Sequence, residues 1–361
     1  MGEGMRVFVT GSTGFIGSNV VRQLLKAGHE VRALVRPGAD TRQLDGLPVE
    51  RISGNLQDHA SLRRGMAGCA WVFHVAALYS YWGHRWKEFQ ETNVEGTRRV
   101  LEAARLENVE RIVYTSSVAA LGTRPDGLPA TEDTPGTLAD RIGPYQRSKF
   151  LAEEVVRDFV RQGLPVITVN PSSPVGVGDH KPTPTGQIIV DFLKGRIFGF
   201  TDTGLSIVDV EDVAAGHLLA AERGRIGERY ILGGENLTLK QILDLLADVS
   251  GRPPVHLHIP HWVAHTWSYV DVATAYLIPR HIPAATPDKV RLARRYEFFD
   301  SGKAVRELGF RQTPVRVGLR KEFEGKLMVG GGKRRERDCL TISGFLAPDQ
   351  RHLHSHAGCA G

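Results

Sequence analysis

The chain is poor in cysteine and has no long uninterrupted apolar run. Only three cysteines occur in 361 residues, and a sparse, odd set predicts no disulfide framework. The most apolar window, residues 262–278, is interrupted by His265 and Asp271 and is too short to cross a bilayer. The first residues lack the apolar core of a signal peptide. These absences predict a cytoplasmic protein without a transmembrane segment.

A strong excess of charge of one sign is also missing from most of the chain. The formal net charge is +6, but residues 326–361 hold six Lys/Arg and three Asp/Glu, so only +3 is left for the rest. That balance argues against nucleic acid as a partner. Residues 327–361 lack apolar periodicity and are predicted to form a disordered tail. Its His352, His354, His356 and Cys359 have no scaffold, so no metal site is predicted.

What the chain does contain is organised around residues 6–25. The apolar run 7–9 is followed by glycines at Gly11, Gly14 and Gly17, and from Phe15 onward apolar residues recur at helical spacing. A strand, a glycine turn and a helix begin a βαβ unit, in which the turn lets a pyrophosphate approach the amides at the helix start. The predicted dinucleotide-binding residues here are Gly11, Thr13, Gly14, Phe15, Ile16 and Gly17.

The second predicted strand, 30–36, ends on a cation. An acidic residue about 20 positions beyond the glycines would bind the ribose 2′-hydroxyl of NAD, but Arg36 stands there, followed by Pro37 and Gly38. A guanidinium suits a 2′-phosphate, so NADP is the predicted cofactor, with NAD as the alternative. Arg36 as a solvated arginine at a strand end is the other interpretation.

Strands alternating with helices continue as far as residue 170. Further strands are predicted at 49–52, 71–75, 111–115 and 163–169. Six such strands give an α/β fold with a Rossmann-type doubly wound parallel sheet. The later segments have no βαβ repeat and suggest a smaller mixed α/β substrate-binding cap domain. The predicted division is 5–170 with 205–225 for the Rossmann domain, and 171–204 with 226–326 for the cap; 170–185 is predicted to be a loop, and 227–232 a strand.

The residues suited to chemistry lie at the end of the fifth strand and the start of the next long helix. Tyr145 and Lys149 share one helix face, so an ammonium can lie near the phenol. A tyrosine with a pKa near 10 needs about 4 kcal/mol of preference for the phenolate to act as a base at neutral pH, and Lys149 together with an oxidised nicotinamide could supply it. Ser117, with Ser116 as the alternative, can polarise the reacting oxygen.

Three motifs in this order resemble the extended short-chain dehydrogenase/reductases, the NAD-dependent epimerase/dehydratase family. They are Thr-Gly-x-x-Gly-x-x-Gly from Thr10, Ser-Ser-Val-Ala-Ala-Leu-Gly from Ser116, and Tyr-x-x-x-Lys from Tyr145. The stretches 31–38, 114–127, 170–186 and 228–239 are most similar to the hopanoid-associated sugar epimerase group, itself similar to dihydroflavonol reductases. The group's usual histidine is replaced by Asp209, which puts any contact by that histidine in doubt.

The resemblance implies further cofactor contacts and a homodimer. Asn55 and Leu56 would lie near the adenine, Ala76 and Ala77 beside the nicotinamide ribose, and Pro171, Ser172 and Ser173 at the nicotinamide amide. The loop residues Tyr79, Tyr81 and Trp82 either line the substrate entrance or pack locally. Lys181, Thr183 and Thr185 either form an anion site for a sugar-nucleotide diphosphate or belong to a capped surface helix. Asn93 is expected to hold the active-site backbone.

The function predicted from these features is that of an NAD(P)-dependent sugar or sugar-nucleotide epimerase/oxidoreductase, associated with hopanoid synthesis. An NADPH-dependent carbonyl reductase similar to dihydroflavonol 4-reductase is the alternative, because nothing in the sequence separates returning the hydride to the substrate from exchanging the cofactor. A non-catalytic dinucleotide sensor is the alternative of another class. Such a sensor would be expected to have lost Tyr145 or Lys149, and both are present.

Overall fold

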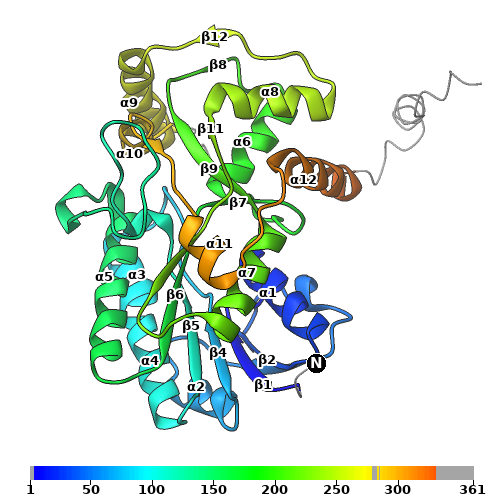
Figure 1. Cartoon of the computed structure of the whole chain (residues 1–361). Helices are drawn as coiled ribbons and strands as arrows, with labels where there is room; N and C mark the ends of the chain where they lie inside the picture. The colour runs from blue at the N-terminus through cyan, green and yellow to red at the C-terminus, as the bar shows by residue number, and fades with distance from the viewer. Residues whose placement is uncertain (1–3, 279–282, 284, 331–361) are drawn as a thin grey trace, which may run out of the picture. The chain divides into compact units, whose positions relative to one another are not determined.

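The computed structural model describes residues 4–278, 283 and 285–330 (Figure 1). Its main sheet has seven strands, all parallel, in the order β10-β6-β5-β4-β1-β2-β3. This confirms the predicted doubly wound architecture. The strands are β1 (Arg6–Thr10), β2 (Glu30–Val35), β3 (Val49–Ser53), β4 (Trp71–His74), β5 (Arg111–Thr115), β6 (Val166–Pro171) and β10 (Arg229–Leu232).

Two features of this sheet differ from the sequence-based expectation. The strand β10 pairs with β6 and therefore belongs to the main sheet, whereas the predicted division placed 226–326 in the cap. The sequence pattern of residues 229–232 predicts a strand but does not show which sheet that strand joins. The strand β6 begins at Val166 and not at Gly163, because Gly163 adopts a left-handed φ of 89° in the turn after the preceding helix.

Helices cover both faces of the sheet, as Figure 1 shows. One hydrophobic core lies between the sheet and α1, α7 and α11, and the other between the sheet and α2, α4 and α5. In α1 the buried Val20, Val21 and Leu24 form one stripe, which fixes the face that packs inward. The bounds are α1 (Phe15–Lys26), α2 (His59–Met66), α4 (Gly96–Leu106), α5 (Gly143–Arg161), α7 (Val210–Arg223) and α11 (Gly302–Leu308).

A second, mixed region is built around β9 (Gly204–Asp209). This strand pairs with β11 (Glu235–Thr238) in antiparallel fashion and with β7 (Ser173–Val175) and β13 (Tyr296–Glu297) in parallel. A separate pair joins β8 (Gly199–Phe200) to β12 (Leu257–His258). The helices here are α6 (Pro184–Leu193), α8 (Leu239–Ser250), α9 (His261–Leu277), α10 (Pro287–Leu292) and α12 (Val315–Gly330).

Short helical segments complete the described chain: α3 (Trp86–Phe89), the π-helical η2 (Gln90–Glu95), and the 3₁₀ turns η1 (Arg42–Leu44), η3 (Val118–Ala120) and η4 (Leu138–Asp140). The predicted loop 170–185 contains β7 and the start of α6. A strand of three residues that includes Pro174 has too little pattern to be recognised without its partner β9.

Contacts divide the chain into residues 1–323 and residues 324–361. The helix α12 continues to Gly330, past the predicted start of the tail at 327. The remaining tail, with its histidines and Cys339 and Cys359, lies outside the described residues. Within the described residues, no helix is both long and apolar enough to cross a membrane.

Candidate active site

The predicted site residues meet in one cavity of about 570 Å³ at the carboxyl ends of β1, β4, β5 and β6. All of the predicted catalytic and cofactor-binding residues line it, from Gly11 to Ser173, and so do Tyr79, Lys181, Thr183 and Thr185. Tyr81 and Trp82 are outside this lining. Strand ends of a doubly wound sheet are where such folds bind ligands.

The glycine turn has the shape that the sequence predicts for binding a pyrophosphate. Gly11 has a φ of 70°, and a Cβ there would lie 2.6 Å from the backbone nitrogen of Ala76. A Cβ on Gly17 would lie 2.0 Å from the carbonyl oxygen of Gly11. The start of α1 has no side-chain cap, so its first amides are available to an anion. The turn therefore fits a dinucleotide.

The end of the cavity predicted to bind adenosine contains Arg36 and Asn55. Arg36 follows β2, is exposed, and has no hydrogen bond or ion pair from its side chain to any described residue. The side-chain oxygen of Asn55 already accepts from the amides of Gln57 and Asp58, at 2.8 and 3.1 Å. The Asn55 acceptor is thus used by the chain itself, which leaves its Nδ2 as the donor for a base.

Asn93 holds the loop after β4, as predicted. Its Oδ1 accepts from the Leu78 amide at 2.7 Å, and its Nδ2 donates to the Leu78 carbonyl at 3.0 Å and to the Ser148 hydroxyl at 2.9 Å. The side chain is buried in η2, and it ties the cavity wall to α5. This confirms a positioning role for Asn93.

The three predicted catalytic side chains come from two elements. Tyr145 and Lys149 are buried near the start of α5, and Ser117 follows β5. The Ser117 hydroxyl lies near enough to the Tyr145 phenol to lower the pKa of that phenol, while the Lys149 Nζ donates to the Thr115 carbonyl at 2.9 Å. The lysine is therefore anchored at the end of the same strand that presents the serine.

The protonation of this group is set mainly by burial. Burial raises the pKa of Tyr145 to about 12, although the nearby Ser117 hydroxyl lowers it. Burial lowers the pKa of Lys149 to about 8, against a rise caused by Glu153. At neutral pH, Tyr145 thus carries its proton and Lys149 its charge. The phenol is in the state needed to donate a proton, not to accept one.

The hydrogen bonds of Ser116 give it a different role from that of Ser117. Its hydroxyl donates to Glu153 at 2.5 Å, and the same carboxylate oxygen accepts from Asn170 at 2.7 Å. Glu153 and Asn170 were not singled out from the sequence, because a buried carboxylate on α5 is indistinguishable there from a surface one. This network gives Ser116 a structural role and leaves Ser117 as the serine that contacts Tyr145.

A buried hydroxyl lies at the opposite wall, after β6. The Ser172 Oγ is buried and has no hydrogen-bond partner in the described part of the chain, and Pro171 and Ser173 line the cavity beside it. An unpaired buried hydroxyl is costly, so this atom fits a ligand group such as a carboxamide.

The predicted substrate residues divide between the cavity and its surroundings. Tyr79 stacks on Tyr145 with ring centroids 4.5 Å apart, and the Tyr81 ring lies 6.3 Å from that of Tyr145. Trp82 packs on Tyr276, at 6.0 Å between centroids. Tyr79 is thus at the cavity, whereas Trp82 lies outside its lining and contacts α9, a distant segment of the chain.

The residue that caps α6, Thr183, is hydrogen-bonded to the side chain of Asp179. The Thr183 side chain caps this helix by accepting from the Gly186 amide at 3.1 Å. The Asp179 carboxylate accepts from the Thr183 amide at 3.0 and 2.9 Å and from its hydroxyl at 3.0 Å. The cap by Thr183 fits the capped-helix alternative better than the anion site predicted with Lys181 and Thr185.

Glu297 is a residue near the site that the sequence did not indicate. It lies on β13, accepts from the Gln146 Nε2 at 3.4 Å, and its charge raises the pKa of Tyr145. Burial raises the pKa of Glu297 itself to about 7. A two-residue strand gives no sequence signal that it will approach α5. Among the described residues, no group of three metal-ligating side chains gathers anywhere.

Comparison with known proteins identifies the family. The model of the NAD dependent epimerase/dehydratase family matches residues 7–233. The chain belongs to this family. A putative dihydroflavonol 4-reductase of Synechocystis is 42% identical over 316 residues, which cover 86% of this chain and 92% of the relative. Sterol demethylase protein B of Methylococcus capsulatus is 37% identical over 320 residues, covering 87% and 95%.

A solved structure supports the same assignment. The crystal structure of gox2253 is 41% identical, has a TM-score of 0.81, and covers 90% of this chain and 98% of its own. The chain is therefore an NAD(P)-dependent oxidoreductase of the extended short-chain dehydrogenase/reductase type, as its motifs predict.

Proposed function

We propose that the enzyme transfers hydride between NAD(P) and a carbon that carries a hydroxyl or carbonyl oxygen, and that it works as an NADPH-dependent carbonyl reductase. The observation that carries this proposal is the meeting of Tyr145, Ser117 and Lys149 in the same cavity as the glycine turn. The nicotinamide, when bound, supplies the hydride. The residues of the chain supply the proton and the electrostatic environment.

Each of the three side chains has a distinct part. The Ser117 hydroxyl hydrogen-bonds the substrate oxygen and draws electron density toward it. Tyr145 donates its proton to that oxygen. A phenol carries its proton at neutral pH, and burial raises its pKa further. Lys149, fixed on the Thr115 carbonyl, places a positive charge near the phenolate that remains.

Two observations favour reduction over sugar-nucleotide epimerisation. The start of α6 is capped by the Thr183 side chain, which is itself hydrogen-bonded to Asp179, and a relative that matches most of the chain is named a putative reductase. The family model, by contrast, is named for epimerases, so the hopanoid-associated sugar epimerase stays as the second candidate. Arg36 supports a preference for NADP. A homodimer and a cytoplasmic location stay predictions.

The nucleotide carried by the purified enzyme separates the two candidates. A reductase must exchange its cofactor after each turnover, so NADPH should bind reversibly and be consumed with a dihydroflavonol as ketone. An epimerase regenerates its cofactor on the protein, so it should retain NAD through purification and convert UDP-glucose without net change in nicotinamide absorbance. Retained NAD with no NADPH consumption would replace the reductase proposal with the epimerase.

Tyr145→Phe tests the chemistry common to both candidates. Packing is preserved while the titrating hydroxyl is removed, so turnover should fall by roughly a hundredfold or more with cofactor affinity unchanged. Turnover is measured by nicotinamide absorbance with the dihydroflavonol and by product formation with UDP-glucose, and affinity is measured by nicotinamide fluorescence. Tyr269→Phe, an exposed tyrosine on α9, is the matched control. Turnover of Tyr145→Phe close to that of the parent would remove this phenol from the mechanism.

A further inference from the structure

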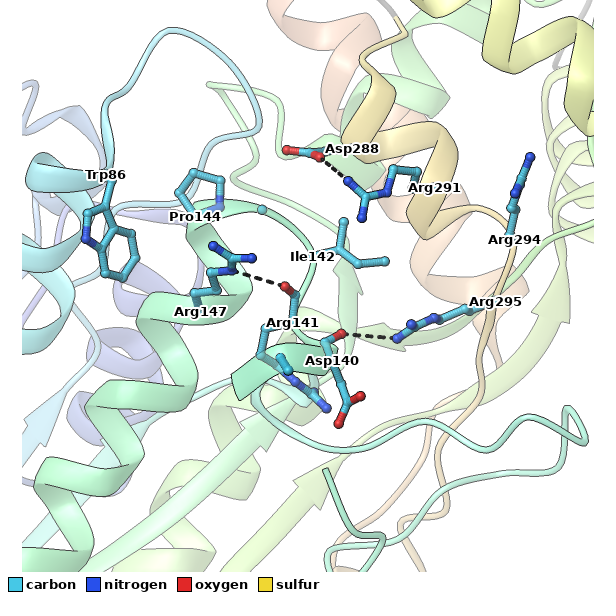
Figure 2. A pocket seen from close by; sticks show the side chains of 12 residues that line it. Trp86, Asp140, Arg141, Ile142, Pro144, Arg147, Asp288, Arg291, Arg294 and Arg295 are labelled. Atoms are coloured by element: carbon cyan, nitrogen blue, oxygen red, sulfur yellow. Dashed lines mark hydrogen bonds and ion pairs between the residues drawn. The ribbon is translucent and has the colours of Figure 1, made fainter. Parts of the chain in front are cut away.

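A second cavity, of about 500 Å³, lies between the loop that precedes α5 and the helix α10 (Figure 2). Ile142, Gly143 and Pro144 contribute to its wall, just before the catalytic Tyr145. Five of the 12 lining residues are arginines and two are aspartates. The cofactor and catalytic residues line the other cavity, so neither the family chemistry nor the proposed function uses this one.

The two aspartates do not balance the arginines. The Asp140 carboxylate caps η4, accepting from the Thr137 amide at 2.7 Å and from its hydroxyl at 2.8 Å. Asp288 pairs loosely with Arg291, at 3.6 Å. The Asp140 carboxylate is thus hydrogen-bonded to Thr137, and the Asp288 carboxylate pairs with Arg291 alone among the arginines of the cavity.

One of the five arginines is committed to structure. The guanidinium of Arg141 is buried and donates to the carbonyl oxygens of Thr137, Ala119 and Leu121. Such a side chain closes the wall of the cavity but has few donors left for a ligand. The capacity for binding therefore rests on the other four.

Three exposed guanidiniums have no carboxylate partner among the residues that the structure describes. Arg147 donates its Nε to the Arg141 carbonyl at 3.3 Å, and Arg295 donates its Nη1 to the Asp140 carbonyl at 3.2 Å. Arg294 makes no hydrogen bond or ion pair with the described residues. Carbonyl oxygens do not neutralise a cation. Asp140 and Glu297 act on Arg295 at longer range, but five arginines against two aspartates leave an excess of positive charge in the lining.

Two arginines elsewhere in the chain show how a carboxylate can pair with a guanidinium. Arg32 pairs with Glu50 at 2.6 Å, and Arg63 pairs with Glu107 at 2.7 Å. Like charges held close together repel, and a mobile anion relieves that repulsion. The cavity thus has the charge pattern of an anion-binding site.

We propose that this cavity binds a small organic molecule that carries a phosphate or diphosphate, held by Arg147, Arg291, Arg294 and Arg295. The planar guanidinium donates two parallel hydrogen bonds to a phosphate, which a lysine cannot do. The volume lies in the range of small-molecule sites. The Trp86 side chain, 39% exposed, stands at one wall (Figure 2) and offers a face for the organic part of the ligand.

The test uses inorganic pyrophosphate as the probe, titrated calorimetrically into enzyme saturated with NADPH. Saturation occupies the glycine turn, so pyrophosphate cannot bind there in place of the cofactor. We expect saturable binding by the parent. Arg291→Gln/Arg294→Gln should weaken it by about tenfold or more, because two exposed donors are lost without any buried contact. Arg147→Gln, on the opposite wall, should weaken it as well and provides a test if the double variant does not fold.

Arg252→Gln is the matched control, because Arg252 is exposed and lies outside the cavity. It removes the same charge and should leave binding unchanged. The absence of pyrophosphate binding in the parent, unchanged binding in either cavity variant, or an equal loss in Arg252→Gln would each overturn the proposal. The readout is binding and not turnover, so failure here is distinct from failure of the reductase proposal.

Discussion

The two cavities hold their polar groups in opposite ways. Around the catalytic cavity, Lys149, Asn93 and Ser116 are buried and each is held by a short hydrogen bond. In the arginine cavity, Arg147 and Arg294 are exposed and have few or no contacts with the described chain. The first cavity acts through preorganised groups in a place of low dielectric, whereas the second offers an excess of charge to whatever enters it.

Because of this difference, mutations in the two cavities should have different effects on stability and on ligand binding. A polar residue beneath the catalytic cavity serves both the fold and the chemistry, so its loss should cost stability even when no ligand is present. The loss of an exposed arginine of the second cavity should weaken ligand binding and leave the stability of the fold unchanged. The predictions that follow test this contrast, from the largest effect to the smallest.

His217 is a buried titratable group that contacts the end of β5 and that should destabilise the fold when it is protonated. Its Nδ1 donates to the Val213 carbonyl at 2.7 Å and its Nε2 accepts from the Thr115 hydroxyl at 2.8 Å. Burial lowers the pKa of His217 to about 4. The unfolded chain therefore binds a proton between pH 6.5 and 4 that the folded chain does not, and stability falls as the pH drops through that window.

Between pH 7 and pH 4, this one histidine should lower the free energy of unfolding by about 3 kcal/mol. Denaturant unfolding of the parent and of His217→Gln at pH 7 and at pH 4 measures it. The variant should be less stable at pH 7 but should lose about 3 kcal/mol less on acidification. His256→Gln, an exposed histidine, should follow the parent. Equal losses in the parent and His217→Gln would contradict the buried neutral state.

Asn93→Ala should lower the free energy of unfolding by about 1 to 3 kcal/mol. It leaves the amide and carbonyl of Leu78 and the hydroxyl of Ser148 without their partner. Denaturant titration measures the change, with Gln90→Ala, an exposed residue of the same segment, as the control. A stability equal to that of the control would show that the loop does not depend on Asn93.

The catalytic cavity could be predicted because its chemistry is tied to local patterns. Gly11, Ser117 and Tyr145 stand at strand ends or helix starts, and parallel strands bring such points to one edge of the sheet. The residue pattern therefore indicated the fold, the glycine turn and the group of Ser117, Tyr145 and Lys149. The contacts assigned to Asn55, Leu56, Ala76, Ala77 and residues 171–173 came from the family resemblance and not from the pattern.

The parts that could not be predicted depend on contacts between distant segments. The strands β7 and β13 have three and two residues, and only their pairing with β9 makes them strands. Glu297 lies on β13, and Asp179 lies between β7 and α6. The arginine cavity likewise joins residues 139–147 to residues 288–295, and no spacing in the sequence shows that these stretches meet.

Unlike the buried polar residues around the catalytic cavity, Arg36 is not held by other residues that the structure describes. It lines the cofactor end, yet it is exposed and has no partner among the described residues, like the arginines of the second cavity. We therefore expect Arg36→Asp to change cofactor choice and leave the thermal midpoint of unfolding unmoved. The carboxylate repels the 2′-phosphate of NADP and accepts hydrogen bonds from the ribose hydroxyls of NAD.

The ratio of the dissociation constants for NADP and NAD, measured by nicotinamide fluorescence with the reduced forms, should shift by about tenfold or more toward NAD. Arg36→Gln is the matched variant: it removes the phosphate partner without adding a carboxylate, so it should weaken NADPH and leave NADH unchanged. An unchanged ratio in both variants would make Arg36 a solvated cation at a strand end. A fall in the thermal midpoint would instead show that its charge is built into the fold, as the buried groups of this cavity are.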